Sequence, residues 1–384
     1  MLELNENGYT ASAAGVTVTL LPKEFALLRF LVQGRDRAFT REHLLDAVWP
    51  LEYPVERTVD DHIYRLRRKL APLPGVTIRT VRGLGYSLTL KEPGLRVDAN
   101  PSARDDGLRE AMRGVFATYQ RYGQGRSMLA LARQQEVLGY EIDPFYAWYI
   151  HFVEGDLEWL LGDTLPLTER IYALLLFAMT GLQAEESLRY AECALEREVL
   201  SPFQHAEMKV LNILDLYAVT GRFERAEEQL TDTYEVIASP DFENFDIPVA
   251  TSALFVRLLA GAPDETLRED ECRIEAMMRE RPFLREIGSF TVLRGLIELR
   301  SGEEKRAGEL LEEGLDVLEV SGFVPLKLSG LHRIVHACRR MGLQPEHPLR
   351  NRYEARFADE LERYGIPGAL PRLRKQLDAA LGTH

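Results

Sequence analysis

The chain has 384 residues, of which 46% are hydrophobic and 28% charged, and its formal net charge is −13. This length accommodates two or three domains, each with its own core. The sequence contains no run of about 18 apolar residues and no charged and then apolar leader, which argues against a membrane span and a secretory signal and predicts a cytoplasmic protein.

The charge is unevenly divided along the chain. Residues 1–92 hold 13 Lys and Arg against 11 Asp and Glu, whereas the remainder holds 34 against 49, a net charge of −15. An acidic body of that size repels phosphate groups, so contact with nucleic acid is expected only in the N-terminal part.

Two helices are expected to follow a small sheet at the N-terminus. Residues 2–20 alternate between apolar and polar in short segments, which predicts antiparallel strands. A helix is predicted at 22–34, but Leu21 precedes it and has no capping oxygen, so its start is expected to be loosely defined. Thr40 is expected to cap the next helix, and Trp49 at its end is expected to lie in the core.

The next helix combines an apolar stripe with a basic face. Thr58 and Asp61 have the spacing of a capping box, so the helix is expected to start at Thr58. Four apolar residues at helical spacing are expected to face inward: Val59, Ile63, Leu66 and Leu70. The other side carries Asp61, His62, Arg65 and Arg68. Arg and His donate hydrogen bonds to guanine and phosphate, and a helix fits the major groove of DNA.

A strand and a hairpin follow this helix. Residues 76–81 alternate as a strand, and the glycines at 83 and 85 give a tight hairpin tip. Arg82 at such a tip would reach the minor groove, where a narrow groove concentrates negative potential.

These residues resemble the winged-helix DNA-binding domain of OmpR/PhoB-type transcription regulators. The family pattern R-T-V-D-x-H-I-x-x-L-R-x-K-L, followed by T-V-R-G-x-G-Y, is matched nearly position by position within residues 57–86. The resemblance implies a recognition helix at 57–70 and a wing with contacts from Thr80 and Arg82. It also implies contacts to bases or phosphates from four residues of the helix: His62, Tyr64, Arg65 and Arg67. Taken with the polar face of the helix, the predicted DNA-binding residues are Arg57, Thr58, Asp61, His62, Tyr64, Arg65, Arg67, Arg68, Thr80 and Arg82.

The chain departs from the family in ways that affect function. Asp61 stands where the family often has an apolar residue, and Tyr64 stands where Arg is common, so the base preference does not carry over. In the family, the loop that corresponds to 50–56 touches RNA polymerase; here it is either such a contact or an ordinary surface connector. Only about 20 residues lie upstream, so the family's usual receiver domain, and control by aspartyl phosphorylation, are not expected.

A linker is expected between two domains. Residues 93–106 contain two prolines and almost no apolar periodicity. The sequence therefore predicts a winged-helix domain at 1–92 and a second, all-α domain at 107–384.

The second domain contains a repeat. Glycines recur every 40 or 41 residues, and each is expected to end an apolar helix in the left-handed conformation: Gly181, Gly221, Gly261, Gly302 and Gly342. A proline follows each glycine by 19 to 25 residues and is expected to stop the next helix: Pro202, Pro240, Pro282, Pro325 and Pro367. Stacked helix pairs of this kind form a curved solenoid with a concave face.

Two segments, 217–230 and 298–311, resemble tetratricopeptide repeats, with Ala226 and Ala307 at the small packing position. The predicted fold class is thus an α+β winged helix-turn-helix domain followed by an all-α, tetratricopeptide-like solenoid. An aromatic group at helical spacing is expected to belong to its core rather than to a ligand cage, with a partner surface as the alternative: Phe145, Tyr146, Trp148, Tyr149, Phe152 and Trp159.

Motifs for catalysis are absent from the sequence. It contains no phosphate-binding G-x-x-x-x-G-K-[ST] loop, no Cys-x-x-Cys and no G-x-S-x-G turn. His332 and His336 have metal-ligand spacing, but Arg333 stands where a zinc protease needs Glu. No enzyme activity, cofactor or metal is predicted. The cysteines, Cys193, Cys272 and Cys338, are odd in number and far apart, which indicates small buried thiols rather than disulfides.

The sequence therefore predicts a sequence-specific transcription regulator that binds double-stranded promoter DNA. A homodimer is expected because one winged helix contacts too few phosphates for tight binding at physiological salt. The helical domain is expected to bind a peptide or protein in its groove, with a small molecule as the alternative. Two other classes remain: an adaptor whose winged helix no longer binds DNA, and an enzyme with an unrecognised helical active site.

Overall fold

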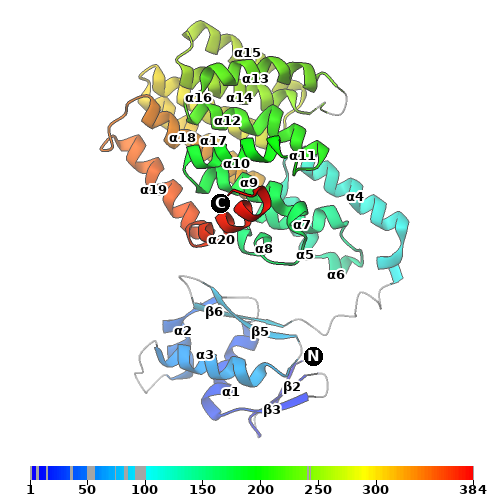
Figure 1. Cartoon of the computed structure of the whole chain (residues 1–384). Coiled ribbons are helices and arrows are strands. Elements are labelled where there is room, and N and C mark those ends of the chain that lie inside the picture. Colours follow the sequence, from blue (N-terminus) through cyan, green and yellow to red (C-terminus); the bar gives the residue numbers. More distant parts are fainter. Residues whose placement is uncertain are drawn as a thin grey trace. The chain divides into compact units, whose positions relative to one another are not determined.

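The computed structural model of the protein describes residues 2–5, 8–13, 16–34, 38–49, 57–73, 75–81, 85–90, 101–239, 242 and 244–383. The chain divides into two compact units, Met1–Asp105 and Asp106–His384. Figure 1 shows strands and helices together in the first unit and helices throughout the second.

Two small antiparallel sheets belong to the N-terminal unit. The first has the order β1-β2-β3 and is formed by Glu3–Asn5, Thr10–Ala13 and Val16–Thr19. The second has the order β4-β6-β5 and is formed by Ala38–Thr40, Gly85–Leu90 and Val76–Val81. The predictions of an N-terminal sheet and of a strand at 76–81 are confirmed. In the second sheet, Thr80 lies opposite Tyr86, which places the start of β6 beside the end of β5.

Three helices pack with these sheets: α1 (Pro22–Gln33), α2 (Arg41–Val48) and α3 (Arg57–Leu70). The apolar stripe of α3 faces the core as predicted, since each of its members is at most 2% exposed: Val59, Ile63, Leu66 and Leu70. Trp49, which was predicted to be a core residue, is 5% exposed. The core of the unit therefore consists of the inward faces of α1, α2 and α3, with those of the strands against them.

The start of α1 differs from its prediction. The backbone N–H of Leu21 donates to Oε2 of Glu24 at 2.8 Å, and Nζ of Lys69 donates to the same oxygen at 2.7 Å. Burial alone would raise the pKa of Glu24, which is 1% exposed, but these two partners outweigh it and lower that pKa. The helix start is thus fixed by a carboxylate of its own first turn, and the expectation of a loosely defined start is wrong.

The two threonine caps have different outcomes. Thr40 caps α2 as predicted, because its hydroxyl oxygen accepts a hydrogen bond from the backbone N–H of His43 at 3.2 Å. Thr58 does not begin α3, since the helix already includes Arg57. Thr58 lies in the first turn instead, and its carbonyl accepts a hydrogen bond from the ring of His62.

A short 3₁₀ helix, Pro101–Arg104, occupies part of the segment predicted to be a linker, and residues 91–100 lie outside the described residues. The helices of the second unit are α4 (Asp106–Arg121), α5 (Gly125–Arg133), α6 (Gln135–Leu138), α7 (Pro144–Glu154), α8 (Leu157–Leu160), α9 (Leu167–Gly181), α10 (Ala184–Glu196), α11 (Pro202–Glu207), α12 (Ile213–Val219), α13 (Phe223–Ile237), α14 (Asp246–Ala260), α15 (Asp264–Glu280), α16 (Leu284–Arg300), α17 (Glu304–Ser321), α18 (Val324–Arg340), α19 (Pro348–Arg363) and α20 (Ile366–Leu381). A π-helical segment, Met208–Asn212, joins α11 to α12.

The predicted helix pairs are present, and the glycines separate their members. The four later glycines, Gly221, Gly261, Gly302 and Gly342, have φ between +74° and +85°, which is the left-handed conformation expected of them. Gly181 differs, because it is the last residue of α9 and its φ is not positive. A Cβ there would lie 2.9 to 3.0 Å from the side chains of Ile366 and Leu370, so its role is to let α20 approach.

Three of the five prolines lie at the other helix end than predicted. Pro202 is the first residue of α11, and Pro325 and Pro367 lie in the first turns of α18 and α20. Pro282 falls between α15 and α16, and Pro240 lies outside the described residues. Proline is suited to the first turn, where an N–H would have no intrahelical partner, so Pro202, Pro325 and Pro367 lie at helix starts rather than at helix ends.

The helical array closes on itself through its last helix. α20 packs against α9 and α10, and α18 also contacts α9 (Figure 1). Arg374 of α20 binds Glu186 of α10 with distances of 2.6 and 2.9 Å, and the hydroxyl of Tyr190 donates to Asp378 at 2.8 Å. An open solenoid would keep its first and last repeats apart, whereas here they share one core.

All three cysteines are free. Cys338 is buried as expected and Cys193 is partly buried. Cys272 on α15 is exposed, so the expectation of buried thiols is wrong for that residue.

Candidate DNA-binding surface

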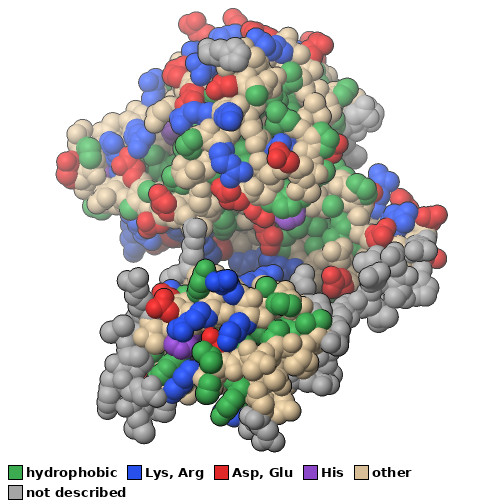
Figure 2. Space-filling model, turned by 60° about the horizontal axis from the view of Figure 1, so that its bottom comes forward, with side chains coloured by type: hydrophobic (Ala, Val, Ile, Leu, Met, Phe, Trp, Pro, Cys, Tyr) green, Lys and Arg blue, Asp and Glu red, His purple; other side chains and the backbone are tan. Residues whose placement is uncertain are grey.

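The outward side of α3 carries the polar residues that the sequence singled out. Asp61, Tyr64, Arg65 and Arg68 are all exposed, and the exposed fraction of Tyr64 is 63%. Figure 2 shows Lys and Arg side chains, with a histidine among them, on the N-terminal unit. The buried stripe fixes the rotation of the helix about its axis, so these side chains project away from the core.

A polar cluster that sequence reasoning missed anchors the first turn of α3. Asp60 accepts hydrogen bonds from Nε of Arg41 at 2.8 Å and from the hydroxyl of Tyr86 at 2.7 Å. Burial alone would raise the pKa of Asp60, but the Tyr86 hydroxyl and the Arg41 guanidinium together lower it. The cluster joins α2, α3 and β6. No local sequence pattern indicated it, because Arg41 and Tyr86 are 19 and 26 positions from Asp60.

Arg67 connects α3 to the wing strand. Its Nε donates to the backbone carbonyl of Ile78 and its Nη2 donates to the hydroxyl oxygen of Thr80, each at 2.9 Å. The guanidinium also lies 5.6 Å from the ring centroid of Tyr86. Arg67 and Thr80, both predicted to contact DNA, therefore bind each other, and their interaction sets the position of β5 relative to the helix.

His62 is more constrained than the other residues of this face. Its Nδ1 lies 2.8 Å from the carbonyl oxygen of Thr58, and its ring packs edge-on against Trp49 with 4.9 Å between centroids. A carbonyl oxygen only accepts hydrogen bonds, so Nδ1 carries the hydrogen and Nε2 is left to interact with a ligand. Among the residues that the structure describes, Arg65 bonds only within its own helix: its Nε donates to the carbonyl of Asp61 at 3.2 Å, and its Nη2 lies 3.5 Å from Nδ1 of His62.

Several predicted contacts lie outside the described residues. These are Arg82 with the rest of the hairpin tip at 82–84, and the connecting loop at 50–56. The backbone of Arg57 belongs to α3, and its side chain is also outside the described part.

The part of the chain that the structure describes contains no group of three or more metal-ligating side chains and no helix long and apolar enough to cross a membrane. His332 and His336 lie 4.3 Å apart between ring centroids. Burial lowers the pKa of both, that of His336 to about 4, which keeps them uncharged at neutral pH. Both lie on α18, and the ring of His332 packs beside Phe357 with 5.9 Å between centroids.

Comparison with known proteins agrees with this geometry. Residues 15–88 match the family described as "Transcriptional regulatory protein, C terminal". The transcriptional regulatory protein VxrB of Vibrio cholerae is 48% identical over 75 residues, which cover 19% of this chain and 29% of that protein. The phosphate regulon transcriptional regulatory protein PhoB of Rhizobium meliloti is 47% identical over 90 residues, covering 23% of this chain and 39% of PhoB.

Among solved structures, the DNA-binding domain of Bacillus subtilis CssR is 31% identical and matches 23% of this chain and 100% of that domain, with a TM-score of 0.21. The matched part spans about a third of the length of the two curated relatives. The family match covers the two described helix–strand interactions of the site, that of Asp60 with Tyr86 and that of Arg67 with β5. The N-terminal unit therefore carries a winged-helix DNA-binding domain of the OmpR/PhoB type.

Proposed function

We propose that the protein is a sequence-specific transcription regulator that binds promoter DNA through α3 and the wing. The observation that carries this proposal is the exposed, hydrogen-bonding face of α3 within a segment that matches a DNA-binding family. Arg65 and Arg68 provide donors for guanine and phosphate, and Tyr64 adds an exposed aromatic ring. The loop at 50–56 is a proposed contact with RNA polymerase, on the resemblance alone.

The decisive experiment measures binding of the full chain to duplexes from its own promoter regions by fluorescence anisotropy. Specific duplexes should bind more tightly than scrambled ones, and the slope of log affinity against log salt should be about −0.9 per neutralised phosphate. Genome-wide footprinting would supply the promoters. An adaptor whose winged helix has lost DNA affinity would give no binding to any duplex even at low salt.

We further propose that the regulator acts as a homodimer. Paired half-sites about 10 bp apart compensate for the few phosphates that one winged helix reaches. The helical unit is the proposed site of dimerisation because it is the larger of the two. Light scattering is expected to give twice the chain mass of 43.7 kDa. A monomeric mass both free and on DNA would contradict this proposal.

The helical unit is proposed to sense a ligand and to pass its presence to DNA binding. The sequence favoured a peptide or protein in a concave groove. Two observations favour the alternative, a small molecule: α20 closes the array onto α9, and the inner helices line a cavity of about 510 Å³. That volume lies within the range of small-molecule sites, about 300 to 1,000 Å³.

A further inference from the structure

The cavity lies where the repeats turn toward one another. Its lining comes from α7, α9, α14, α16 and α18, from the end of α4, and from the α11–α12 region. The pairs that the glycines define thus each contribute one helix, from α9 in the first pair to α18 in the last. α18 contacts both α7 and α9, so helices from both ends of the array border the same cavity.

One wall is aromatic. Phe145, Trp148, Tyr149 and Phe152 of α7 all line the cavity. Phe145 is 45% exposed and stacks on Tyr149 with 5.5 Å between centroids. Of the aromatic group expected to be core, Tyr146 is buried, but these four present surface to the cavity. The expectation of a core cluster therefore holds for only part of the group, and ring faces are available to a ligand.

A second wall carries polar groups in an unusual stretch of helix. Glu207 ends α11, and the π-helical segment Met208–Asn212 follows it. Glu207, Leu211 and Asn212 all line the cavity. π-helical turns are rare, have hydrogen bonds between residues five positions apart, and are frequently found at functional sites. Nδ2 of Asn212 donates to the hydroxyl of Tyr172 at 2.8 Å, and that hydroxyl interacts with the Glu207 carboxylate.

The charges of the lining leave one carboxylate unmatched. Arg333 binds Asp215 through two hydrogen bonds of 2.7 and 2.9 Å. Arg285 lies 3.5 Å from Glu286, which is 8% exposed and has one oxygen, Oε2, without a hydrogen-bond partner. Glu207, by contrast, forms no ion pair with any residue that the structure describes.

Neighbouring groups do not neutralise Glu207. Burial is the largest effect on the pKa of Glu207 and raises it. The hydrogen bond from Tyr172 and the charge of Arg285 lower this pKa, but by less. Burial also raises the pKa values of Tyr149 and Tyr172, so both phenols stay protonated and uncharged. The remaining arginine of the lining, Arg121, is exposed, and solvent screens its charge. A positive group brought by a ligand would therefore find an unpaired partner here.

We propose that this cavity binds a small organic cation, with a protonated amine at Glu207 and an apolar or aromatic body against the α7 rings. The carboxylate provides the charge partner, Asn212 and Tyr172 orient it, and the ring faces attract both the body and the positive charge. Binding itself is independent of the proposed function, whereas any effect of the ligand on DNA rests on it.

Isothermal titration calorimetry of the full chain tests the charge requirement with three probes that share a phenylethyl body: 2-phenylethylamine, 2-phenylethanol and 3-phenylpropanoate. The amine should bind saturably and at least about tenfold more tightly than the neutral alcohol and the anion, as one desolvated charge pair supplies. Equal affinity of the amine and the alcohol, or no binding of the amine at millimolar concentration, would overturn the proposal.

Two variants locate the site. Glu207→Gln keeps the shape but removes the charge, so it should lose the preference for the amine while retaining the affinity for the alcohol. Phe145→Ala, at a partly exposed position that tolerates truncation, should weaken both probes. Glu313→Gln, an exposed acid on α17, is the matched control and should change neither. If Glu207→Gln binds the amine like the parent chain, the assigned carboxylate is wrong.

The pH dependence gives an independent readout. An ammonium group prefers the ionised carboxylate, so amine affinity should rise with pH through the pKa of Glu207. That range lies above the ordinary one for glutamate because burial raises the pKa. The dependence should vanish in Glu207→Gln. Titrations without DNA report on the cavity, and anisotropy without ligand reports on DNA binding, so failure of one proposal is distinguishable from failure of the other.

Discussion

Replacing Arg65 with alanine should abolish the preference of the protein for its own operator over a scrambled duplex. The guanidinium is exposed and, in the described part of the chain, bonds only within its own helix, so it can reach a base edge without breaking a described contact between elements. A bidentate contact of this kind supplies about 1 to 3 kcal/mol of discrimination, or roughly 5- to 150-fold in affinity. Fluorescence anisotropy on matched and scrambled duplexes measures the ratio directly.

Three other arginines make the comparison specific. Arg306→Ala removes an exposed arginine from the helical unit and should leave the ratio unchanged. Arg82→Ala, at the wing by resemblance, should weaken both duplexes alike. Arg67→Ala should also lower the melting temperature, because Arg67 holds β5 through Ile78 and Thr80. If Arg65→Ala keeps the parent's ratio, the recognition face has been assigned to the wrong residues.

The elements of the N-terminal unit could be predicted because their signals are local. The period of the apolar residues in α3 and the alternation in β5 depend on neighbours a few positions away, and both predictions held. The contacts that fix these elements are not local. Glu24 meets Lys69 across 45 positions, and Asp60 meets Tyr86 across 26. Neither Glu24 nor Asp60 was therefore predicted to join two elements, although each of them does.

The same division applies to the helical unit. The glycine period of 40 or 41 residues marks the helix pairs, and four of its five glycines take the left-handed conformation that glycine adopts most easily. Closure of the array depends on pairs such as Glu186 with Arg374, which are 188 positions apart, and no local pattern encodes them. The cavity follows from closure, so it could not be inferred from the repeat. Helical spacing also could not separate Tyr146, which is buried, from Phe145, which faces the cavity.

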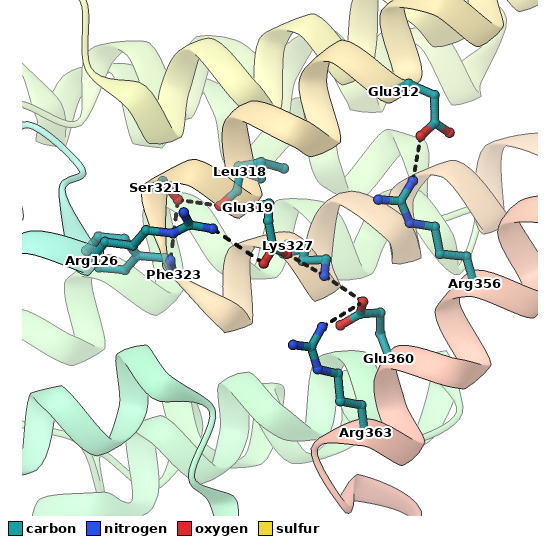
Figure 3. A network of polar contacts seen from close by, with 10 residues as sticks. All are labelled: Arg126, Glu312, Leu318, Glu319, Ser321, Phe323, Lys327, Arg356, Glu360 and Arg363. Atoms are coloured by element: carbon teal, nitrogen blue, oxygen red, sulfur yellow. Dashed lines mark hydrogen bonds and ion pairs between the residues drawn. The ribbon is translucent and has the colours of Figure 1, made fainter. Parts of the chain in front are cut away.

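Replacing Lys327 with alanine should lower the free energy of unfolding of the helical unit more than replacing an exposed lysine does. Lys327 is 4% exposed, and its ammonium lies 2.6 Å from both Glu319 of α17 and Glu360 of α19 (Figure 3). One buried lysine thus joins three helices. Removing it leaves Glu360, whose side chain is 13% exposed, without its main partner. Breaking a buried pair from one side costs about 3 to 5 kcal/mol, because the remaining charge stays desolvated.

Chemical denaturation of the full chain, followed by circular dichroism, would measure the loss, with Lys305→Ala as the exposed control. Acid provides a second test. The hydrogen bond and charge of Lys327 lower the pKa of Glu319, so this pair stabilises the fold above the ordinary glutamate pKa near 4.5. That stability is lost as the pH falls through the lowered value. Lys327→Ala should not show this loss of stability in acid, since it has no ammonium group to lower the pKa of Glu319. A denaturation midpoint in Lys327→Ala equal to that of the parent would contradict this prediction. It would mean that Glu319 and Glu360 need no ammonium partner and that packing alone holds the three helices together.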